Sequence, residues 1–223
     1  MDHPQVGCQV QPHSKKNVQE TYVPKIVGRI HFDEKRIRVN GILFDDLNAI
    51  DSKTKFVLAE EFVDKKDLQA VKLFLMQIKR LCYKQILEQY KAEKHKSVKK
   101  RKLVTFVCDG CPTFKTACHL LFGRVARIIS GVPIACKKYG LAHNNNHIER
   151  YNREIKRRMI VIGSFQTFQG VRFFCSLRRI IHNFVNSHSE LQGKTPAEAA
   201  GIHLQLGGNK LLGLIRHAAK KSR

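Results

Sequence analysis

The chain has 223 residues, of which 43% are hydrophobic and 26% are charged, so its composition fits one substantial folded domain and excludes a disordered polymer. The 41 lysines and arginines against 18 acidic residues leave a net charge of +23, which indicates a polyanionic partner, either nucleic acid or an acidic membrane surface. No apolar run approaches the ~20 residues that cross a bilayer, so the sequence contains no candidate membrane span.

The N-terminal half begins with a polar stretch and continues with strand patterns. Residues 1–25 contain three prolines and no apolar period, so we expect a tail or linker there. Apolar and polar residues alternate over residues 25–39, and the runs 42–51 and 55–62 are rich in β-branched and aromatic residues. Asn40-Gly41 is a typical hairpin turn between the first two runs. The pattern predicts three strands joined as a meander.

Helical spacing of apolar residues follows the third strand and returns later in the chain. The first amphipathic stripe covers residues 68–90, and the second begins at Asn145. Between them, residues 103–109 form a continuous apolar run that ends in Asp109, as expected of a strand buried on both faces. We also expect a helix at 113–122, an apolar run at 125–129, a helix at 170–187 and a basic tail at 205–223. This order predicts a mixed α/β sheet with helices on its faces.

Three acidic residues are candidates for chemistry. Asp33 lies within the first strand, Asp109 ends the buried strand, and Glu149 lies in the first turns of the helix that begins near Asn145. Two neighbouring strands can bring Asp33 and Asp109 together, and a helix that crosses the sheet can add Glu149. Carboxylates held so close either share a proton or bind a hard divalent cation such as Mg²⁺.

Each acid also has a plainer explanation. Asp109 could serve only as a turn or helix-cap residue before Gly110. Glu149 could be a salt-bridge partner in a basic helix. Asp33 could be a solvent-facing strand residue, in which case its neighbour Glu34 would be the alternative ligand.

Five segments carry a resemblance to a known family. They are HFDEKRIRVNG (31–41), AIDSKT (49–54), FVCDG (106–110), NNNHIERYNREIKRR (144–158) and KTPAEAAGI (194–202). Together they resemble the catalytic core of DDE transposases of prokaryotic insertion sequences and of retroviral-type integrases. Glu149, Asn152 and Lys156, with Glu154 between them, fall at the spacing seen in integrases.

The resemblance implies a ribonuclease H-like fold, a mixed five-stranded sheet flanked by helices, with residues 26–204 as the catalytic core. It implies Asp33, Asp109 and Glu149 as a catalytic triad that binds Mg²⁺ or Mn²⁺, in the form of two ions. The implied reaction is nicking at transposon ends and strand transfer of the freed 3′-hydroxyl into target DNA. The implied partners are DNA and further copies of the chain, as a homodimer or higher oligomer, in the cytoplasm of a prokaryote in association with the nucleoid.

The helix that carries Glu149 also carries candidate DNA contacts. Arg153, Lys156 and Arg157 lie four, seven and eight residues after Glu149, hence on its face of the helix. A row of cations beside a metal site suits a DNA backbone, although a solvated helix face is the alternative. Asn145 or Asn146 is the candidate helix N-cap, and we expect it to contact the active site as well. With Asn152 from the integrase-like segment, the DNA-binding candidates are Asn145, Asn152, Arg153, Lys156 and Arg157. The run 94–102 should add salt-sensitive, sequence-independent affinity.

Other residue types with metal-binding potential have simpler roles. The seven cysteines are irregularly spaced and the start lacks a secretory signal, so we expect reduced thiols in an intracellular protein. Cys108, Cys111, Cys118 and His119 could form a zinc site, but no second matching knuckle exists, so core thiols are expected. We expect His143 and His147 to be capping or DNA-facing residues and Asp51 to hold a hairpin turn.

Three functions are therefore compared. The first is the DDE transposase core. The second is a ribonuclease H-like nuclease or resolvase that cuts DNA without joining it. The third is a truncated, non-catalytic DNA-binding remnant, which we consider because only about 25 polar residues precede the first strand, where such transposases usually carry an end-binding module.

Overall fold

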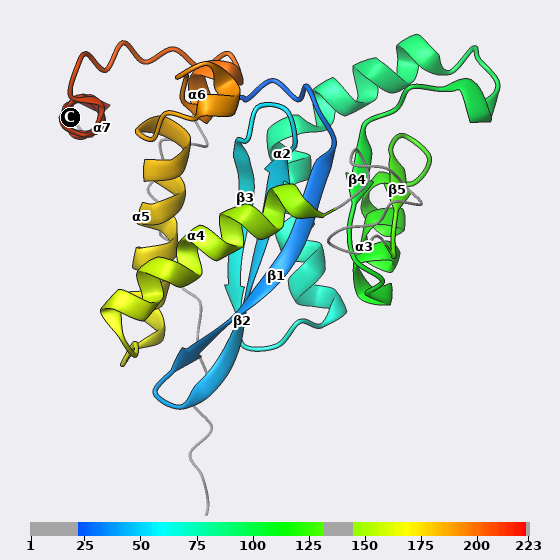
Figure 1. The fold of residues 1–223 in the computed structure, drawn as a ribbon. Helices are drawn as coiled ribbons and strands as arrows, with labels where there is room; N and C mark the ends of the chain where they lie inside the picture. The colour runs from blue at the N-terminus through cyan, green and yellow to red at the C-terminus, as the bar shows by residue number, and fades with distance from the viewer. Residues whose placement is uncertain (1–21, 132–144, 222–223) are drawn as a thin grey trace, which may run out of the picture.

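The computed structural model describes residues 22–131 and 145–221. A five-stranded sheet has the order β3-β2-β1-β4-β5, with β1 to β3 antiparallel and β4 and β5 parallel to β1 (Figure 1). The strands are β1 (Ile30–Val39), β2 (Ile42–Asp51), β3 (Val57–Val63), β4 (Thr105–Val107) and β5 (Arg127–Ile129). The helices are α2 (Leu68–Glu93), α3 (Pro112–Phe122), α4 (Asn146–Ile162), α5 (Phe168–Phe184), α6 (Pro196–Ala199) and α7 (Lys210–Lys221), with short 3₁₀ turns η1 (Val98–Lys100) and η4 (Ser189–Leu191). The predicted mixed sheet flanked by helices is confirmed.

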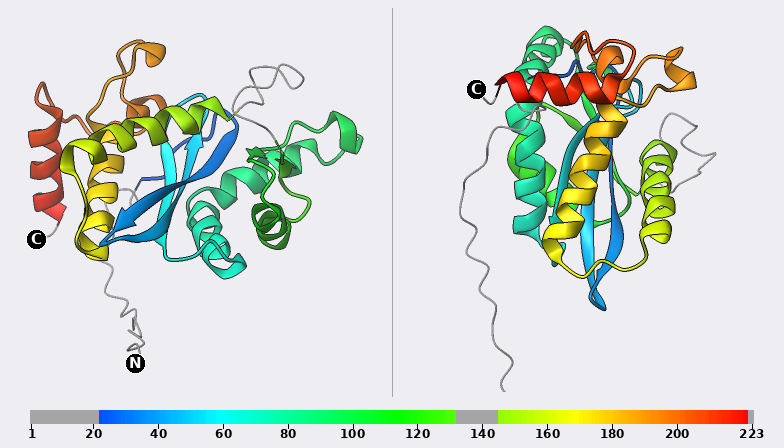
Figure 2. Two further views of the ribbon diagram at one scale, coloured as in Figure 1. Left: turned by 60° about the horizontal axis from the view of Figure 1, so that its bottom comes forward. Right: turned by 90° about the vertical axis from the view of Figure 1, so that its left-hand side faces the viewer.

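Helices cover both faces of this sheet. Helix α2 packs against β3 and α3, while α4 crosses β1 and β2 on the opposite face and α5 packs against β3. The right-hand view in Figure 2 shows α2 and α4 on opposite sides of the strands. The alternation of β1 explains this arrangement, because Ile30 and Phe32 face α2 and α3 while Ile37 and Val39 face the other layer.

The larger core lies between the sheet and helices α2 and α3. Four phenylalanine rings meet there: the Phe32 ring centroid lies 4.8 Å from that of Phe114, 5.8 Å from that of Phe106 and 6.5 Å from that of Phe74. All four side chains are buried, and each contributes about 1.5–3 kcal/mol through removal of apolar surface from water. This cluster fixes β1 and β4 as neighbours beneath α3.

Two turns set the register of the meander. Asn40 and Gly41 have φ angles of 46° and 84°, which is the left-handed conformation that a two-residue hairpin requires. The buried Asp51 carboxylate accepts hydrogen bonds from the backbone N–H groups of Lys53 and Thr54, at 2.8 and 2.9 Å. The prediction that Asp51 holds a hairpin turn is confirmed.

The segment before β1 and the C-terminal helix extend the core. The N–H of Lys25 donates to the carbonyl of Ala200 at 2.8 Å, and the Tyr22 hydroxyl lies 2.8 Å from Nε2 of His217 on α7. Leu214 of α7 is buried within the larger core. Where the sequence predicts a basic tail, the structure therefore has a helix over Lys210–Lys221 that is anchored to the core through Leu214. No helix among the described residues is long and apolar enough to span a membrane.

Candidate active site

The topology brings Asp33 and Asp109 to one place. Strands β1 and β4 are parallel neighbours, and His31 pairs with Val107 at the end of β4. Asp33 and Asp109 each lie two residues beyond this pair, so the two residues lie side by side at the same distance along the parallel strands. Asp33 is 9% exposed, whereas Asp109 is half-buried at the start of the turn into α3. The carboxylate of Asp109 accepts a hydrogen bond from the N–H of Cys111 at 3.1 Å, which holds it in that turn.

Glu34 completes a cluster of three acids. Single carboxylate oxygens of Asp33, Glu34 and Asp109 all lie within 4.8 Å of one another. Asp33 and Glu34 leave β1 on opposite faces, and Asp109 reaches both because the short β4 has already ended beside them. Glu34 is thus part of the site together with Asp33, although the sequence suggested it only as an alternative to Asp33.

Glu149 joins the cluster through Asp33. It lies in the first turn of α4, and its carboxyl group is close enough to share a hydrogen bond with that of Asp33. Burial, followed by the negative charges of Glu149 and Glu34, raises the pKa of Asp33 to about 7. Burial and the repulsion between the acids together favour the protonated form of Asp33, and a cation would offset both effects.

Two buried asparagines of α4 bind this part of β1. The side-chain amide of Asn152 donates to Oδ2 of Asp33 at 3.1 Å, and Asn152 is 2% exposed. Oδ1 of Asn145 lies 3.3 Å from Nδ1 of His31, and Asn145 is 3% exposed. Asn145 occupies the N-cap position of α4 as predicted, but its side chain makes no capping hydrogen bond. Both side chains point into the protein and hold α4 on β1.

Lys66 provides a cation beside the cluster. It lies in the loop before α2 and forms an ion pair with Glu34, with its ammonium 5.6 Å from the centre of the Phe114 ring. Although burial favours the neutral amine, the hydrogen bond and charge of Glu34 raise the pKa of Lys66. No sequence pattern pointed to Lys66, since a lysine in a polar loop has no distinguishing neighbours.

The predicted row of cations lies on the outer side of α4. Arg153, Lys156 and Arg157 are exposed, and within the described part of the chain none of them is ion-paired to a carboxylate. His147 instead turns inward, with Nδ1 3.0 Å from the Lys55 ammonium and its ring edge-on to His31. The outer face of α4 is thus free to meet an anionic partner.

The cysteines near the cluster are mostly buried thiols. Cys108 and Cys118 are buried and Cys111 is half-buried. Burial raises the pKa of Cys108 to about 12, so this thiol stays protonated at neutral pH. His143 and Cys136 lie outside the described residues.

The cluster fits a hard divalent cation. Its donor atoms are carboxylate oxygens, which suit Mg²⁺ or Mn²⁺. Asp33, Glu34 and Asp109 could hold such an ion, and Glu149 stands beside Asp33. The raised pKa of Asp33 is consistent with this fit, because burial and the neighbouring negative charges disfavour the ionised carboxylate that a bound cation would stabilise.

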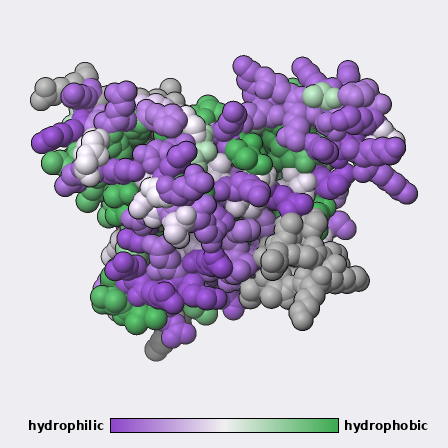
Figure 3. All heavy atoms as spheres, turned by 45° about the horizontal axis from the view of Figure 1, so that its top comes forward, coloured by the Kyte–Doolittle hydropathy of each residue, from purple (hydrophilic) through white to green (hydrophobic). Residues whose placement is uncertain are grey.

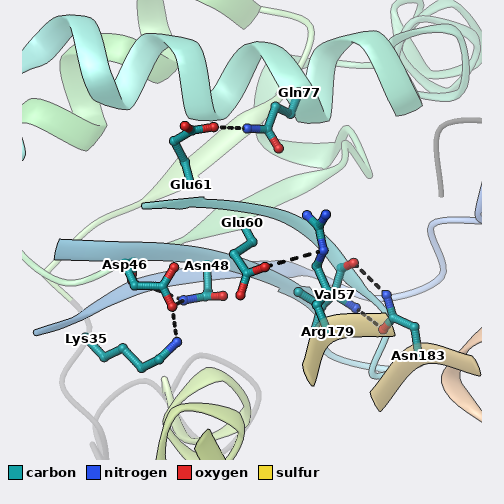
Figure 4. Close-up of polar contacts among 9 residues, drawn as sticks. All are labelled: Lys35, Asp46, Asn48, Val57, Glu60, Glu61, Gln77, Arg179 and Asn183. Atoms are coloured by element: carbon teal, nitrogen blue, oxygen red, sulfur yellow. Dashed lines mark hydrogen bonds and ion pairs between the residues drawn. The ribbon is translucent and has the colours of Figure 1, made fainter. Parts of the chain in front are cut away.

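A second group of acids lies deeper, between the sheet and helices α4 and α5. Asp46 and Glu60 gather there with the thiol of Cys175. The fully buried Lys35 ammonium pairs with Asp46, and Nε of Arg179 lies 3.6 Å from Oε2 of Glu60 (Figure 4). Two protein cations already face these acids, which makes this group a buried ion-pair network within the core.

Comparison with known proteins supports the fold. No family of proteins and no curated protein matches the sequence. The chain is similar in structure to the simian T-cell lymphotropic virus intasome in complex with PP2A regulatory subunit B56 gamma, with a TM-score of 0.51 and 12% identity. That match covers 80% of this chain and 55% of the intasome chain.

Two other structures show weaker similarity. The HTLV-2 integrase catalytic core domain in complex with magnesium has a TM-score of 0.48 at 12% identity, covering 78% of this chain and 95% of that one. The catalytic domain of Mos1 mariner transposase has a TM-score of 0.41 at 16% identity, covering 66% of this chain and 67% of that one. The intasome match, with the observed strand order, shows that the chain has the ribonuclease H-like fold of integrase cores.

Proposed function

We propose that this chain is the catalytic core of a DDE-type polynucleotidyl transferase that nicks DNA at transposon ends and transfers the 3′-hydroxyl into target DNA. One observation carries the proposal: three carboxylates converge where β1 and β4 separate, and Glu149 of α4 is in contact with one of them. The transposon is proposed to be a prokaryotic insertion sequence, as the motifs of the sequence suggest, with the chain acting in the cytoplasm as a dimer or larger assembly.

Both proposed steps are the same displacement at phosphorus. In nicking, a water oxygen bonds to the phosphorus and loses one proton, while the bond from phosphorus to the 3′-oxygen breaks and that oxygen takes up a proton to become the 3′-hydroxyl. In transfer, the freed 3′-oxygen attacks a target phosphate, and a target 3′-oxygen leaves. Bound Mg²⁺ or Mn²⁺, as two ions, would supply activation of the attacking oxygen and stabilisation of the leaving one.

The residues of the chain have distinct roles in this scheme. Asp33, Asp109 and Glu149 hold the ions, with Glu34 within reach of the same place. Asn152 fixes the orientation of Asp33 through its hydrogen bond, so it is a positioning residue. Exposed Arg153, Lys156 and Arg157 line the outer side of the same helix and bind the DNA backbone.

The first experiment measures nicking of supercoiled plasmid in Mg²⁺ or Mn²⁺. We expect nicking by the wild type and its loss in Asp109→Asn and Glu149→Gln, while Glu88→Gln, which removes an exposed charge from α2, leaves it intact. Nicking that survives both substitutions would refute the assigned site. DNA binding without any nicking would favour the non-catalytic remnant.

A second assay separates a transferase from a nuclease. Labelled duplexes with 3′-hydroxyl ends of randomised sequence are incubated with unlabelled plasmid, the wild-type chain and the metal ion. Covalent transfer of label to the plasmid, abolished by Asp109→Asn, is the expected result. Nicking without transfer would identify the nuclease that cuts without joining.

A further inference from the structure

A basic groove lies at the end of the sheet opposite the acidic cluster. It has a volume of about 510 Å³ and is lined by residues before β1, by the turn after β2, by residues 99–105 and by the start of β5. Strands β1, β4 and β5 are parallel, so their first residues share one edge of the sheet and Asp109 lies at the other. Thr105 lines the groove four residues before Asp109, a separation of about 13 Å along an extended chain.

Positive charge predominates in this groove, although the carboxylates of Asp51 and Glu93 lie beside it and accept hydrogen bonds from the backbone N–H groups of Lys53 and Lys102. Its lining includes Arg29, Lys53, Arg127 and the four consecutive cations of residues 99–102, and none of its lining residues is Asp or Glu. Figure 3 shows hydrophilic side chains crowded over the end of α2 and the segment that follows it, at the upper right. Seven cations held together repel one another, which destabilises the free protein and favours an anionic ligand.

Two of these cations are fixed in place by neutral groups. The Arg101 guanidinium donates to the carbonyls of Lys94 and Lys96, at 2.8 and 2.9 Å, and that of Arg127 donates to the carbonyl of Arg101 at 3.1 Å. A carbonyl orients a guanidinium but does not neutralise its charge. By contrast, the Lys66 ammonium beside the acidic cluster faces the carboxylate of Glu34.

The opposite wall of the groove is equally well ordered. The carboxylate of Asp51 accepts hydrogen bonds from the N–H groups of Val27 and Gly28, each at 2.9 Å, as well as from the turn after β2. The N–H of Ser52 donates to the carbonyl of Arg29 at 2.8 Å, and the N–H of Arg29 donates to the hydroxyl oxygen of Ser52 at 3.0 Å. A Cβ atom at Gly28 would lie 2.7 Å from the backbone nitrogen of Lys53, so only glycine allows this close approach. The groove is thus largely formed before a ligand arrives.

We propose that this groove binds the phosphate backbone of duplex DNA at a site separate from the acidic cluster. Cations spread over four chain segments match several successive phosphates better than one small anion. Lysines on flexible stems contribute charge and not base recognition, so binding should be independent of sequence. The choice of DNA as the polyanion rests on the proposed function, whereas the existence of the site does not require catalysis.

The experiment measures binding of a fluorescent duplex by anisotropy in EDTA, where metal-dependent chemistry is silent. One variant carries Lys99→Gln, Lys100→Gln and Lys102→Gln. The matched control carries Arg38→Gln, Arg216→Gln and Lys220→Gln, three exposed cations outside the groove, so both variants lose the same charge. We expect the groove variant to reduce the slope of log K against log salt by about 2–3, and the control by less than about 1.

A single substitution in a different chain segment tests the groove independently of residues 99–102. Arg127→Gln alters β5 on its own, and we expect it to reduce the slope by about 1. Equal effects of the groove variant and the control would overturn the proposal in favour of diffuse attraction, and tighter groove-dependent binding of an RNA duplex would overturn the choice of DNA. Groove-dependent binding without plasmid nicking would refute the proposed catalysis and leave the groove intact, because the two assays use different residues and only one requires metal.

Discussion

Replacing Glu60 by Gln should change how the stability of the protein depends on pH. Glu60 lies on β3 with a side chain that is 4% exposed, and it faces Asp46, Lys35 and Arg179 within the core (Figure 4). Its charge also acts on the buried hydroxyl of Tyr151. Burial and the Asp46 charge raise its pKa from 4.5 to about 7, against the opposing charges of Arg179 and Lys35. Above pH 4.5 the unfolded chain loses this proton first, while the folded chain keeps it until pH reaches about 7.

The sign and size of the effect follow from this difference. A raised acid pKa stabilises the fold fully below pH 4.5, and that stabilisation is lost as pH rises through about 7. A pKa raised from 4.5 to about 7 corresponds to about 3 kcal/mol in the free energy of unfolding. Gln has nearly the same shape as Glu and does not titrate, so the Glu60→Gln protein does not lose this stability as the pH rises. We therefore expect Glu60→Gln to gain about 3 kcal/mol relative to the wild type between pH 4.5 and pH 8.

Urea unfolding at constant ionic strength, repeated at half-unit steps from pH 4.5 to 8, measures this difference directly. Glu88→Gln on the exposed side of α2 is the control, and its difference from the wild type should vary by less than about 0.5 kcal/mol over this range. The reasoning would be refuted if the Glu60→Gln difference were as flat as the control, since Glu60 would then be ionised within the fold at all these pH values.

Two further predictions concern stability. Asp51→Ala removes the acceptor for backbone N–H groups of the β2–β3 turn and of the segment before β1, so we expect a loss of at least about 3 kcal/mol in urea unfolding. A loss below about 1 kcal/mol would mean that water replaces the carboxylate. Phe32→Ala leaves a cavity among buried aromatic rings and should cost about 3–5 kcal/mol, measured in the same way. A near-neutral result for Phe32→Ala would show that the rings of Phe114 and Phe106 collapse into the space.

The sequence predicted the architecture because local patterns agree with the tertiary structure. Alternation marked the meander, Asn40-Gly41 marked its first turn, and the spacing of apolar residues marked α2, α4 and α5. Asp33 and Asp109 were expected to meet if their strands were neighbours, and the structure brings them together on parallel strands. Boundaries were less exact: the expected strand 103–109 is reduced to three residues because the chain turns at Asp109 toward α3.

Glu34 and Lys66 show what a pattern of residues cannot reveal. Alternation assigns Glu34 to the face opposite Asp33, and the two carboxylates approach a common point only because β4 ends early. Lys66 precedes α2 in sequence and reaches the cluster because the aromatic core docks α2 and α3 beside it. The position of Glu34 depends on where β4 ends and that of Lys66 on how the helices dock, and both are properties of tertiary packing that local sequence does not show.

The inner face of β1 carries His31, Asp33 and Lys35 at three successive inward positions, where alternation alone would require apolar residues. Each of the three has a polar partner: Asn145 for His31, Asn152 for Asp33 and Asp46 for Lys35. A buried polar seam of this kind is less stabilising than an apolar core, and its ion pairs compensate only part of their desolvation. In return, α4 can pack in one register only, because a shift by one residue would separate both asparagines from their partners. That register is the one that holds Glu149 against Asp33, so the stability given up in the seam fixes the geometry of the proposed active site.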